Sequence, residues 1–294
     1  MLTMLQAEQQ RRHHSPPSLK QQYQAFILQR IEAYKNSLGR GDLLGIGQEA
    51  VSELETTVED QFVLTEVLMQ DTVDRLIQRR LRLPSYRRWS TQFRALRLAQ
   101  RQATHWGLDD HCPIVHLLPR IEAGDSALII GAGGEAFACL LTANDMEVTF
   151  IADELACVER VEQRLAGEAL SSDFMALVAD LSRWIPPFSR LHALVVLDVA
   201  VLDRLSLSDR ALVIEQLQQC TEDRGIHLLV PSPHALAPEA FLNCYGNWER
   251  EPLRAGRGRA ATRRNQGLVL TRRPCVNDTE FSVSVDDTVR IARG

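Results

Sequence analysis

The sequence predicts an α/β fold in which a mostly parallel, doubly wound sheet follows an all-helical domain. Two observations support this. Up to about residue 118, apolar residues recur three or four positions apart, as on one face of a helix. After Pro119, short apolar runs of strand length alternate with helical segments, which is typical of a parallel sheet covered on both faces. With 294 residues, 45% of them hydrophobic, the chain can bury one large core or two modest ones.

The helical domain is expected to span residues 18–118, after a polar and flexible N-terminal segment of residues 1–17. Ser18 is a suitable N-cap for its first helix. The glycine-rich segment 39–47 lacks the Lys-Ser/Thr pair of a phosphate-binding loop. A flexible link between helices is therefore expected there.

The second half of this domain is expected to be equally helical. A long amphipathic helix or helix pair should run from Glu49 to about Arg82, where Pro84 ends it. Ser85 can cap the next helix. Its apolar side chains are expected to face inward, namely Tyr86, Trp89, Phe93, Leu96, Ala103 and Trp106.

The sheet domain is expected to span residues 119–274. Its predicted strands are Ala127–Ile130, Val148–Ile151, Ala176–Ala179, Ala193–Leu197, Ile226–Val230 and Leu268–Leu270. The tail, residues 275–294, alternates polar and apolar residues at 281–285 and could add an edge strand.

A glycine turn follows the first predicted strand. The run Ala127–Ile130 leads into Gly131-Ala132-Gly133-Gly134, and a helix is expected from Glu135. A strand, a tight turn and a helix N-terminus in this order bring backbone amides close to a ligand. Gly131 and Gly133 would allow that approach, because a Cβ there would fill the ligand's space. The alternative is an ordinary strand–helix turn without a ligand.

Acidic residues stand at the carboxyl ends of three predicted strands, where ligands bind in doubly wound sheets. Asp153 is placed to accept hydrogen bonds from a ribose diol. Asp180, with Leu181 beside it, is placed for an adenine ring, and Asp198 for the neighbourhood of the reacting centre. For each acid alone, a helix N-cap is an equally good explanation.

This arrangement resembles the Rossmann-like fold of class I S-adenosylmethionine (SAM)-dependent methyltransferases. The third glycine of the dinucleotide fingerprint is missing, since Glu135-Ala136 stands in its place. No Asn/Asp-Pro-Pro-Tyr follows the fourth strand, where Asp198-Val-Ala-Val-Leu-Asp203 stands instead. The resemblance therefore implies SAM as co-substrate and argues against amino-methylation of nucleic-acid bases.

A narrower resemblance covers most of the chain from Glu53 to Arg273. The order of motifs is similar to that of the nicotianamine synthase family and its bacterial relatives that make opine-type metallophores of the staphylopine and pseudopaline type. The similar segments are Glu53-Leu-Glu-Thr-Thr-Val-Glu-Asp-Gln-Phe62, Leu83-Pro-Ser-Tyr-Arg-Arg-Trp89, Ile130-Gly-Ala-Gly133, Val213-Ile-Glu-Gln-Leu217, the stretch 229–242 with Ser232 and His234, and 265–273. Val230-Pro231 replaces the family's arginine before Ser-Ala-His, and Ser85 replaces one of its paired tyrosines.

That resemblance implies transfer of the 3-amino-3-carboxypropyl group of SAM to the amine of a small amino acid, histidine in bacteria. The released nucleoside would be 5′-methylthioadenosine. Glu55, Glu59 and Tyr86 are the implied amine-binding and base residues, and Trp89 and His234 the implied substrate-binding residues. The alternative for the glutamates is the solvated face of a helix. A downstream opine-type dehydrogenase is the implied partner. The sequence leaves open whether the protein forms a homodimer.

Two other functions remain as alternatives. A small-molecule methyltransferase would release S-adenosylhomocysteine instead. An RNA- or protein-binding module is suggested by nine arginines and no acid between Arg75 and Arg101. The aromatic residues among them stand at core spacing, however, so pairing with the acid-rich helix before them is favoured.

A second arginine cluster, 250–264, is expected as an exposed loop. His111 and His116 are expected to be structural rather than metal ligands.

Composition narrows the class of protein further. The net charge of −5 argues against general nucleic-acid affinity. No secretory signal or membrane-length apolar run is present, so no membrane partner is expected. The six cysteines are far apart, without a Cys-x-x-Cys pair, and are typical of reduced thiols. Together these features predict a cytoplasmic protein.

Overall fold

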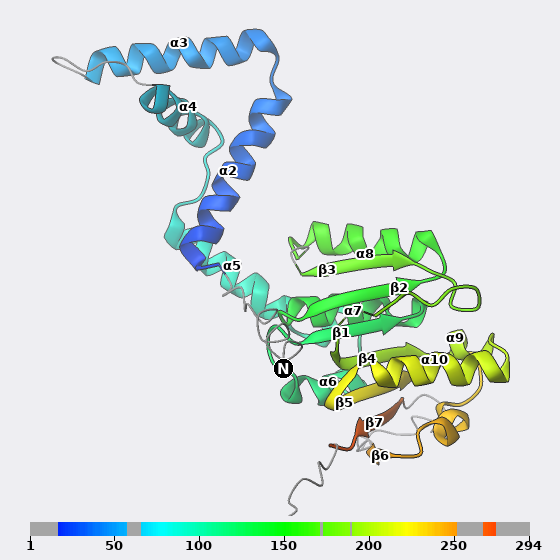
Figure 1. The fold of residues 1–294 in the computed structure, drawn as a ribbon. Coiled ribbons are helices and arrows are strands. Elements are labelled where there is room, and N and C mark those ends of the chain that lie inside the picture. Colours follow the sequence, from blue (N-terminus) through cyan, green and yellow to red (C-terminus); the bar gives the residue numbers. More distant parts are fainter. Residues whose placement is uncertain (1–16, 58–65, 171–172, 189, 252–266, 275–294) are drawn as a thin grey trace, which may run out of the picture. The chain divides into compact units, whose positions relative to one another are not determined.

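The computed structural model describes residues 17–57, 66–170, 173–188, 190–251 and 267–274. The chain divides into two compact units, Met1–Ala99 and Gln100–Gly294 (Figure 1). The boundary lies earlier than the one expected after residue 118. The reason is that Ala103, Trp106, Ile114 and Leu117 are buried in the same cluster as the sheet. Each unit is described by itself.

The first unit is helical, as predicted. Its helices are α2 (Leu19–Ser37), α3 (Arg40–Thr57), α4 (Glu66–Arg80) and α5 (Tyr86–Gln100), the last of which reaches into the boundary. Ser18 caps α2 in a reciprocal capping box with Gln21. Ile27, Ile31, Ile46, Ala50, Leu76 and Ile77 form the core of this unit.

The link expected at 39–47 is wrong for most of its length, because residues 40–47 lie in α3 and only Leu38 and Gly39 separate it from α2. Three glycines in one helix cost about 1 kcal/mol each relative to alanine. Packing offsets that cost, since Ile46 and Ala50 on the same helix are almost fully buried. The acidic motif that begins at Glu53 continues past the end of α3, and Glu59 lies outside the described residues.

The second unit is a sheet of seven strands covered on both faces (Figure 1). The strands are β1 (Ser126–Ile130), β2 (Glu147–Ala152), β3 (Phe174–Val178), β4 (His192–Asp198), β5 (Thr221–Val230), β6 (Trp248–Glu251) and β7 (Leu268–Arg272). Their order is β3-β2-β1-β4-β5-β7-β6. The first five are parallel, whereas β7 runs antiparallel to both β5 and β6. This confirms the predicted α/β, Rossmann-like fold.

Helical segments precede the first strand and connect the later ones. They are η1 (Ala103–Trp106), α6 (Pro113–Leu117), η2 (Leu118–Arg120), η3 (Ala132–Gly134), α7 (Glu135–Ala143), α8 (Leu155–Gly167), α9 (Val199–Asp203), α10 (Leu207–Gln219) and η4 (Pro238–Cys244). Each predicted strand is present to within a few residues. Strand β6 was not predicted, and the edge strand expected at 281–285 lies outside the described residues.

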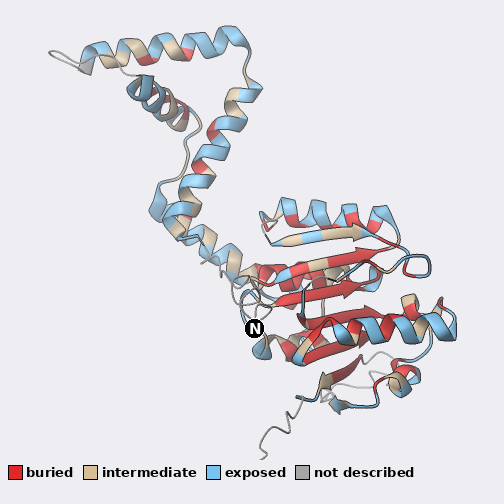
Figure 2. Cartoon of the chain, in the orientation of Figure 1, coloured by how far each residue is buried: buried red, intermediate tan, exposed pale blue. Residues whose placement is uncertain are grey.

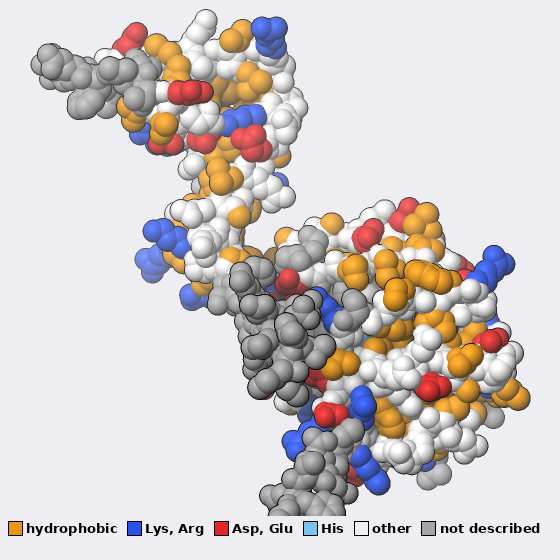
Figure 3. Space-filling view, in the orientation of Figure 1, with side chains coloured by type: hydrophobic (Ala, Val, Ile, Leu, Met, Phe, Trp, Pro, Cys, Tyr) orange, Lys and Arg blue, Asp and Glu red, His pale blue; other side chains and the backbone are white. Residues whose placement is uncertain are grey.

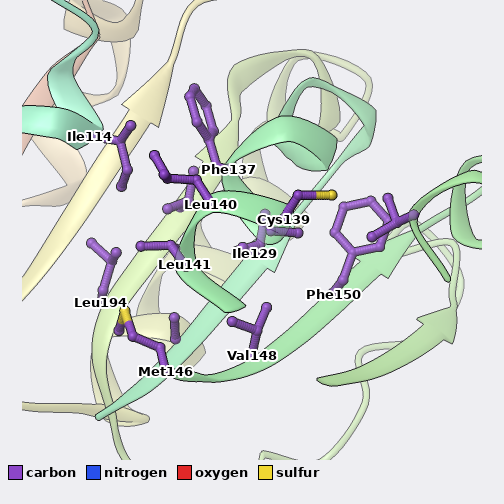
Figure 4. Close-up of a cluster of buried hydrophobic side chains, with 14 of the residues drawn as sticks. Ile114, Ile129, Phe137, Cys139, Leu140, Leu141, Met146, Val148, Phe150 and Leu194 are labelled. Carbon is purple, nitrogen blue, oxygen red and sulfur yellow. The ribbon is translucent and has the colours of Figure 1, made fainter. Parts of the chain in front are cut away.

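Alternate residues of the central parallel strands enter two separate cores. Ala127 and Ile129 pack with α7 and α8. Figure 4 shows Ile129 beside residues of α7 in this cluster. Leu128 and Ile130 pack on the other face, with α10 and η4. All residues of β1 are buried, and buried residues concentrate along the central strands in Figure 2. The double covering explains why these strands read as continuous apolar runs in the sequence.

Candidate functional site at the carboxyl edge of the sheet

The glycine turn follows β1 directly. The chain leaves Ile130 through Gly131, whose φ is +99°, and enters η3 and then α7. The N–H of Gly131 donates to the carbonyl of Ile151 at 2.8 Å, and the N–H of Gly134 donates to the carbonyl of Gly131 at 3.0 Å. A positive φ of this size favours glycine. Backbone bonds therefore fix the predicted strand–turn–helix unit.

Glycine is needed at positions 131 and 133 for a reason different from the one expected. A Cβ on Gly131 would lie 2.5 Å from Cβ of Asp198 and 2.8 Å from Cγ2 of Val201. A Cβ on Gly133 would lie 2.7 Å from Oδ2 of Asp198. The atoms that exclude a side chain here thus belong to the end of β4 and to α9. The close approach that the glycines allow is the approach of Asp198.

Asp198 joins the turn to the start of α9. Its Oδ2 accepts the N–H of Gly133 and its Oδ1 accepts the N–H of Ala200, both at 2.9 Å. The residue is 6% exposed. Both carboxylate oxygens are therefore engaged by backbone groups, and the structure gives Asp198 the N-cap role that the sequence left open.

A hollow of about 140 Å³ lies at the carboxyl ends of β1, β2 and β3. Four predicted residues line it, namely Gly131, Asp153, Asp180 and Leu181. Its volume is below the ~300–1,000 Å³ that is usual for small-molecule sites. The hollow can therefore enclose only part of a ligand as large as a sulfonium nucleoside.

Each charged side chain that lines the hollow has a partner within the protein. Nη1 of Arg204 lies 2.5 Å from Oδ2 of Asp153, and this bond raises the pKa of Arg204. Oδ1 of Asp180 accepts the hydroxyl of Ser182 at 2.6 Å and its N–H at 3.0 Å. These bonds lower the pKa of Asp180, so its carboxylate stays ionised at neutral pH. The hollow therefore offers two carboxylates and one guanidinium beside an apolar floor.

Sequence reasoning did not single out Arg204 or Ser182. Ser182 follows Asp180 by two residues, which is the spacing of a local side-chain turn and could have been noticed. Nothing local marks Arg204, because its approach to Asp153 depends on how α9 ends beside β2.

The remaining predicted residues lie elsewhere. Ala132 is exposed in η3 and does not line the hollow. His234 is exposed in a turn after β5, with a positive φ of 67°. Glu55 is exposed near the end of α3. The roles proposed for these residues stay predictions.

Tyr86 and Trp89 belong to an aromatic cluster in the helical unit. Trp89 is 7% exposed and lies against Tyr23 and Phe93, with ring centroids 5.3 and 4.7 Å away. Tyr86 is 43% exposed and meets Tyr23 edge-on at 5.4 Å. Trp89 therefore faces inward as predicted, whereas Tyr86 and Leu96 are exposed. Helix α5 ends at Gln100, and Ala103 and Trp106 beyond it are buried in the sheet cluster instead.

The arginine-rich stretch is paired in part. Arg79 binds Glu53 and Arg80 binds Glu49, both on α3, as charge pairing within the chain predicts. Arg87, Arg88 and Arg94 on α5 have no ion pair with any residue that the structure describes. Basic and acidic side chains are interspersed over the face shown in Figure 3. Most of the second arginine cluster, 252–264, lies outside the described residues.

Two further observations concern the chain as a whole. Of the residues that the structure describes, no helix combines the length and apolar character needed to cross a bilayer. The five cysteines that can be described are all free thiols. Burial raises the pKa of Cys139 and of Cys220 to about 11. These thiols are therefore protonated and unreactive at neutral pH.

Neither a protein-family model nor a curated protein sequence matches the chain. Several solved structures are similar to part of the chain. The N-methyltransferase NodS from Bradyrhizobium japonicum WM9 is 16% identical, with 56% of this chain and 94% of that chain covered and a TM-score of 0.42. The glycopeptide N-methyltransferase MtfA in complex with S-adenosyl-L-homocysteine is 15% identical, with 57% and 91% covered and a TM-score of 0.45.

A TehB-like SAM-dependent methyltransferase from Corynebacterium glutamicum ATCC 13032 is 15% identical, with 64% of this chain and 97% of that chain covered and a TM-score of 0.43. At such identities and scores the likeness concerns the fold and carries over neither substrate nor reaction. The class that can be stated is therefore a Rossmann-like α/β protein with a polar hollow at the carboxyl edge of its sheet.

Proposed function

We propose that the hollow binds the adenosine part of SAM, which serves as co-substrate. The observation that carries this is the meeting of Gly131, Asp153, Asp180 and Leu181 around one hollow. Asp153 stands about 20 residues after the glycine turn, where an acid accepts hydrogen bonds from ribose hydroxyls. Asp180 can accept from an adenine amino group, and the buried Leu181 offers an apolar contact for the ring. The remainder of the co-substrate must lie outside the hollow, given its volume.

We further propose that the reaction transfers the 3-amino-3-carboxypropyl group to the amine of a small amino acid. The support is the order of motifs shared with the nicotianamine synthase family, so histidine is the acceptor to try first. The amine nitrogen forms a bond to the Cγ beside the sulfonium, and the electron pair of the breaking C–S bond stays on sulfur. The proton lost by the amine goes to a base.

The base candidates in this proposal are Glu55, Glu59 and Tyr86. An ammonium has no lone pair, so the acceptor must be deprotonated before or during attack, and a carboxylate or phenol can serve. Holding the amine in line accounts for most of the remaining demand on the protein. Trp89 and His234 are proposed to contact the acceptor. A downstream opine-type dehydrogenase would then act on the product.

The test is incubation of the full chain with SAM and pooled amino acids, followed by mass spectrometry of nucleoside and conjugate. 5′-Methylthioadenosine and an amino acid heavier by one aminocarboxypropyl group support the proposal. S-Adenosylhomocysteine with a methylated product would replace it by small-molecule methyl transfer. Absence of any SAM binding by calorimetry, with RNA bound at ~0.15 M salt, would favour the binding-module alternative.

A pair of variants ties the activity to the hollow. Asp180→Ala removes an acceptor from the hollow and should leave the sheet intact, because among the described residues the bonds of its side chain go to Ser182 and Arg183, outside the strands. We expect SAM affinity to fall at least tenfold, in keeping with about 1.5–3 kcal/mol for a hydrogen bond to a charged group. The control is Glu147→Gln, at the start of β2 on the opposite edge of the sheet. Equal affinity in both variants would remove Asp180 from the site.

A further inference from the structure

The carboxylate best placed for the ribose is bound by a side chain of the protein itself. Nη1 of Arg204 lies 2.5 Å from Oδ2 of Asp153, and both residues line the hollow. The side chain of Asp153 is 26% exposed and that of Arg204 is 61% exposed. The bond is therefore made at the mouth of the hollow, on the path that a nucleoside would take to reach Asp153.

Arg204 extends from an anchored turn. It is the C-cap residue of α9. Arg210, at the start of α10, donates to the carbonyls of Leu202, Asp203 and Leu205 on either side of it. The backbone at Arg204 is thus fixed by three bonds from one guanidinium, and only the side chain needs to move for the contact with Asp153 to open.

Charge also holds Arg204 at this position. Besides Asp153, the carboxylates of Asp180 and Asp198 act electrostatically on its guanidinium. Asp198 is engaged by two backbone N–H groups and Asp180 by Ser182. Among the described residues, Asp153 is the partner that Arg204 reaches directly. A ribose diol donates two hydroxyl protons and needs the same carboxylate oxygens.

We propose that Arg204 competes with the ribose hydroxyls for Asp153 and so sets the affinity and the diol selectivity of the nucleoside hollow. This inference rests on the proposed function, because it takes the ligand to be an adenosine nucleoside. A nucleoside with its 2′- and 3′-hydroxyls must displace Arg204 from Asp153. A nucleoside without them has nothing to bond to Asp153 and leaves the ion pair in place.

The test uses calorimetry with adenosine, 5′-methylthioadenosine and 2′,3′-dideoxyadenosine as probes, on the full chain. Arg204→Gln is compared with wild type and with Arg190→Gln. The control removes an exposed arginine from another ion pair of the sheet, with Glu147 at the start of β2. These nucleosides are uncharged, so a change in their affinity does not arise from repulsion between Arg204 and the positive charge of SAM.

We expect Arg204→Gln to bind adenosine and 5′-methylthioadenosine about 1.4- to fivefold more tightly, as the ~0.2–1 kcal/mol of an exposed ion pair implies. The affinity for 2′,3′-dideoxyadenosine should not change, and neither should any affinity of Arg190→Gln. Raising the salt concentration should tighten adenosine binding by wild type but not by Arg204→Gln, because salt screens the ion pair.

Three results would overturn the proposal. Weaker adenosine binding by Arg204→Gln would show that the guanidinium contacts the ligand instead of competing with it. An equal gain for the dideoxynucleoside would show that Arg204 only obstructs the hollow. Equal affinities of wild type and Arg204→Gln would refute competition while leaving the nucleoside site in place. If neither protein binds any of the nucleosides, the proposed function fails, and the competition fails with it.

Discussion

Replacement of Asp198 separates its two possible roles, a structural clamp and a ligand contact. The carboxylate accepts N–H groups from Gly133 and Ala200 and is 6% exposed. Asp198→Ala removes both bonds and leaves two backbone N–H groups to find other partners. Loss of an N-cap costs about 1 kcal/mol. Loss of a second hydrogen bond to a charged acceptor costs about 1.5–3 kcal/mol.

We therefore expect Asp198→Ala to lower the free energy of unfolding of the sheet unit by about 2.5–4 kcal/mol. Asp198→Asn retains one acceptor oxygen, so about half of that loss is expected. Urea unfolding followed by tryptophan fluorescence measures both, because Trp106 is 2% exposed in the core of this unit. Asp203→Asn is the control, since that residue lies at the end of the same short helix and makes one ion pair with Arg210, at 3.9 Å.

The reasoning would be refuted if Asp198→Ala unfolded at the same urea concentration as wild type. A variant of unchanged stability that no longer binds SAM would instead restore the ligand contact expected from the sequence. Loss of both stability and binding is the outcome that the structure predicts, because Asp198 holds Gly133 and α9 beside the hollow.

Two stability predictions follow from other parts of the fold. Gly45→Ala should raise the free energy of unfolding by about 0.5–1 kcal/mol, because Gly45 lies in α3 and an added Cβ meets no atom within 4 Å. Gly131→Ala is the contrasting variant and should lower the free energy of unfolding. Unfolding followed by circular dichroism measures both, and a lower stability of Gly45→Ala would argue against a helix at this position. Burial lowers the pKa of His192 to about 4 and that of His227 to about 3, below the usual 6.5. The unfolded chain then binds protons first, so stability should fall from pH 7 to pH 5 by about 2 kcal/mol per histidine. His192→Gln should make that decline shallower in urea titrations, and an unchanged slope would argue against the lowered pKa.

The central strands could be predicted because their signal is local. A strand covered on both faces is apolar along its whole length, and Ala127–Ile130 reads that way in the sequence. Strand β6 (Trp248–Glu251) could not be predicted in this way. It pairs only with β7 among the described strands and carries three charged residues out of four. Edge strands lack the apolar run on which the prediction depends.

The prediction of a link within residues 39–47 failed for the opposite reason, because here the local signal was present but misleading. The glycines at 41, 45 and 47 favour a link between helices, and tertiary packing of Ile46 and Ala50 overrides that preference. The units divide after Ala99, and although the sequence predicts that Trp106 faces inward, it does not indicate that this side chain packs in the core of the sheet unit. Helical periodicity identifies an apolar face but not the surface against which it packs.

Some features of the candidate site could also be predicted from the sequence, and others could not. Asp153 and Asp180 could be brought together in advance, because parallel strands end at one edge of the sheet. The role of Asp198 could not, since the sequence does not tell whether a carboxylate at a strand end faces a ligand or caps the next helix. Arg204 reaches Asp153 across 51 positions of the chain, and only the folded structure shows that contact.

The burial of β1 on both faces also bears on how its alignment with β4 is fixed. A slip by one residue would exchange the side chains that enter the two cores without exposing an apolar face, so burial alone does not select the alignment. Polar contacts at the two ends can select it. Ser126 Oγ lies 2.8 Å from Nδ1 of His192 where the strands begin, and the N–H of Gly133 lies 2.9 Å from Asp198 just beyond their ends. A shifted pairing would break both contacts. They therefore select one register for two strands whose other side chains are apolar.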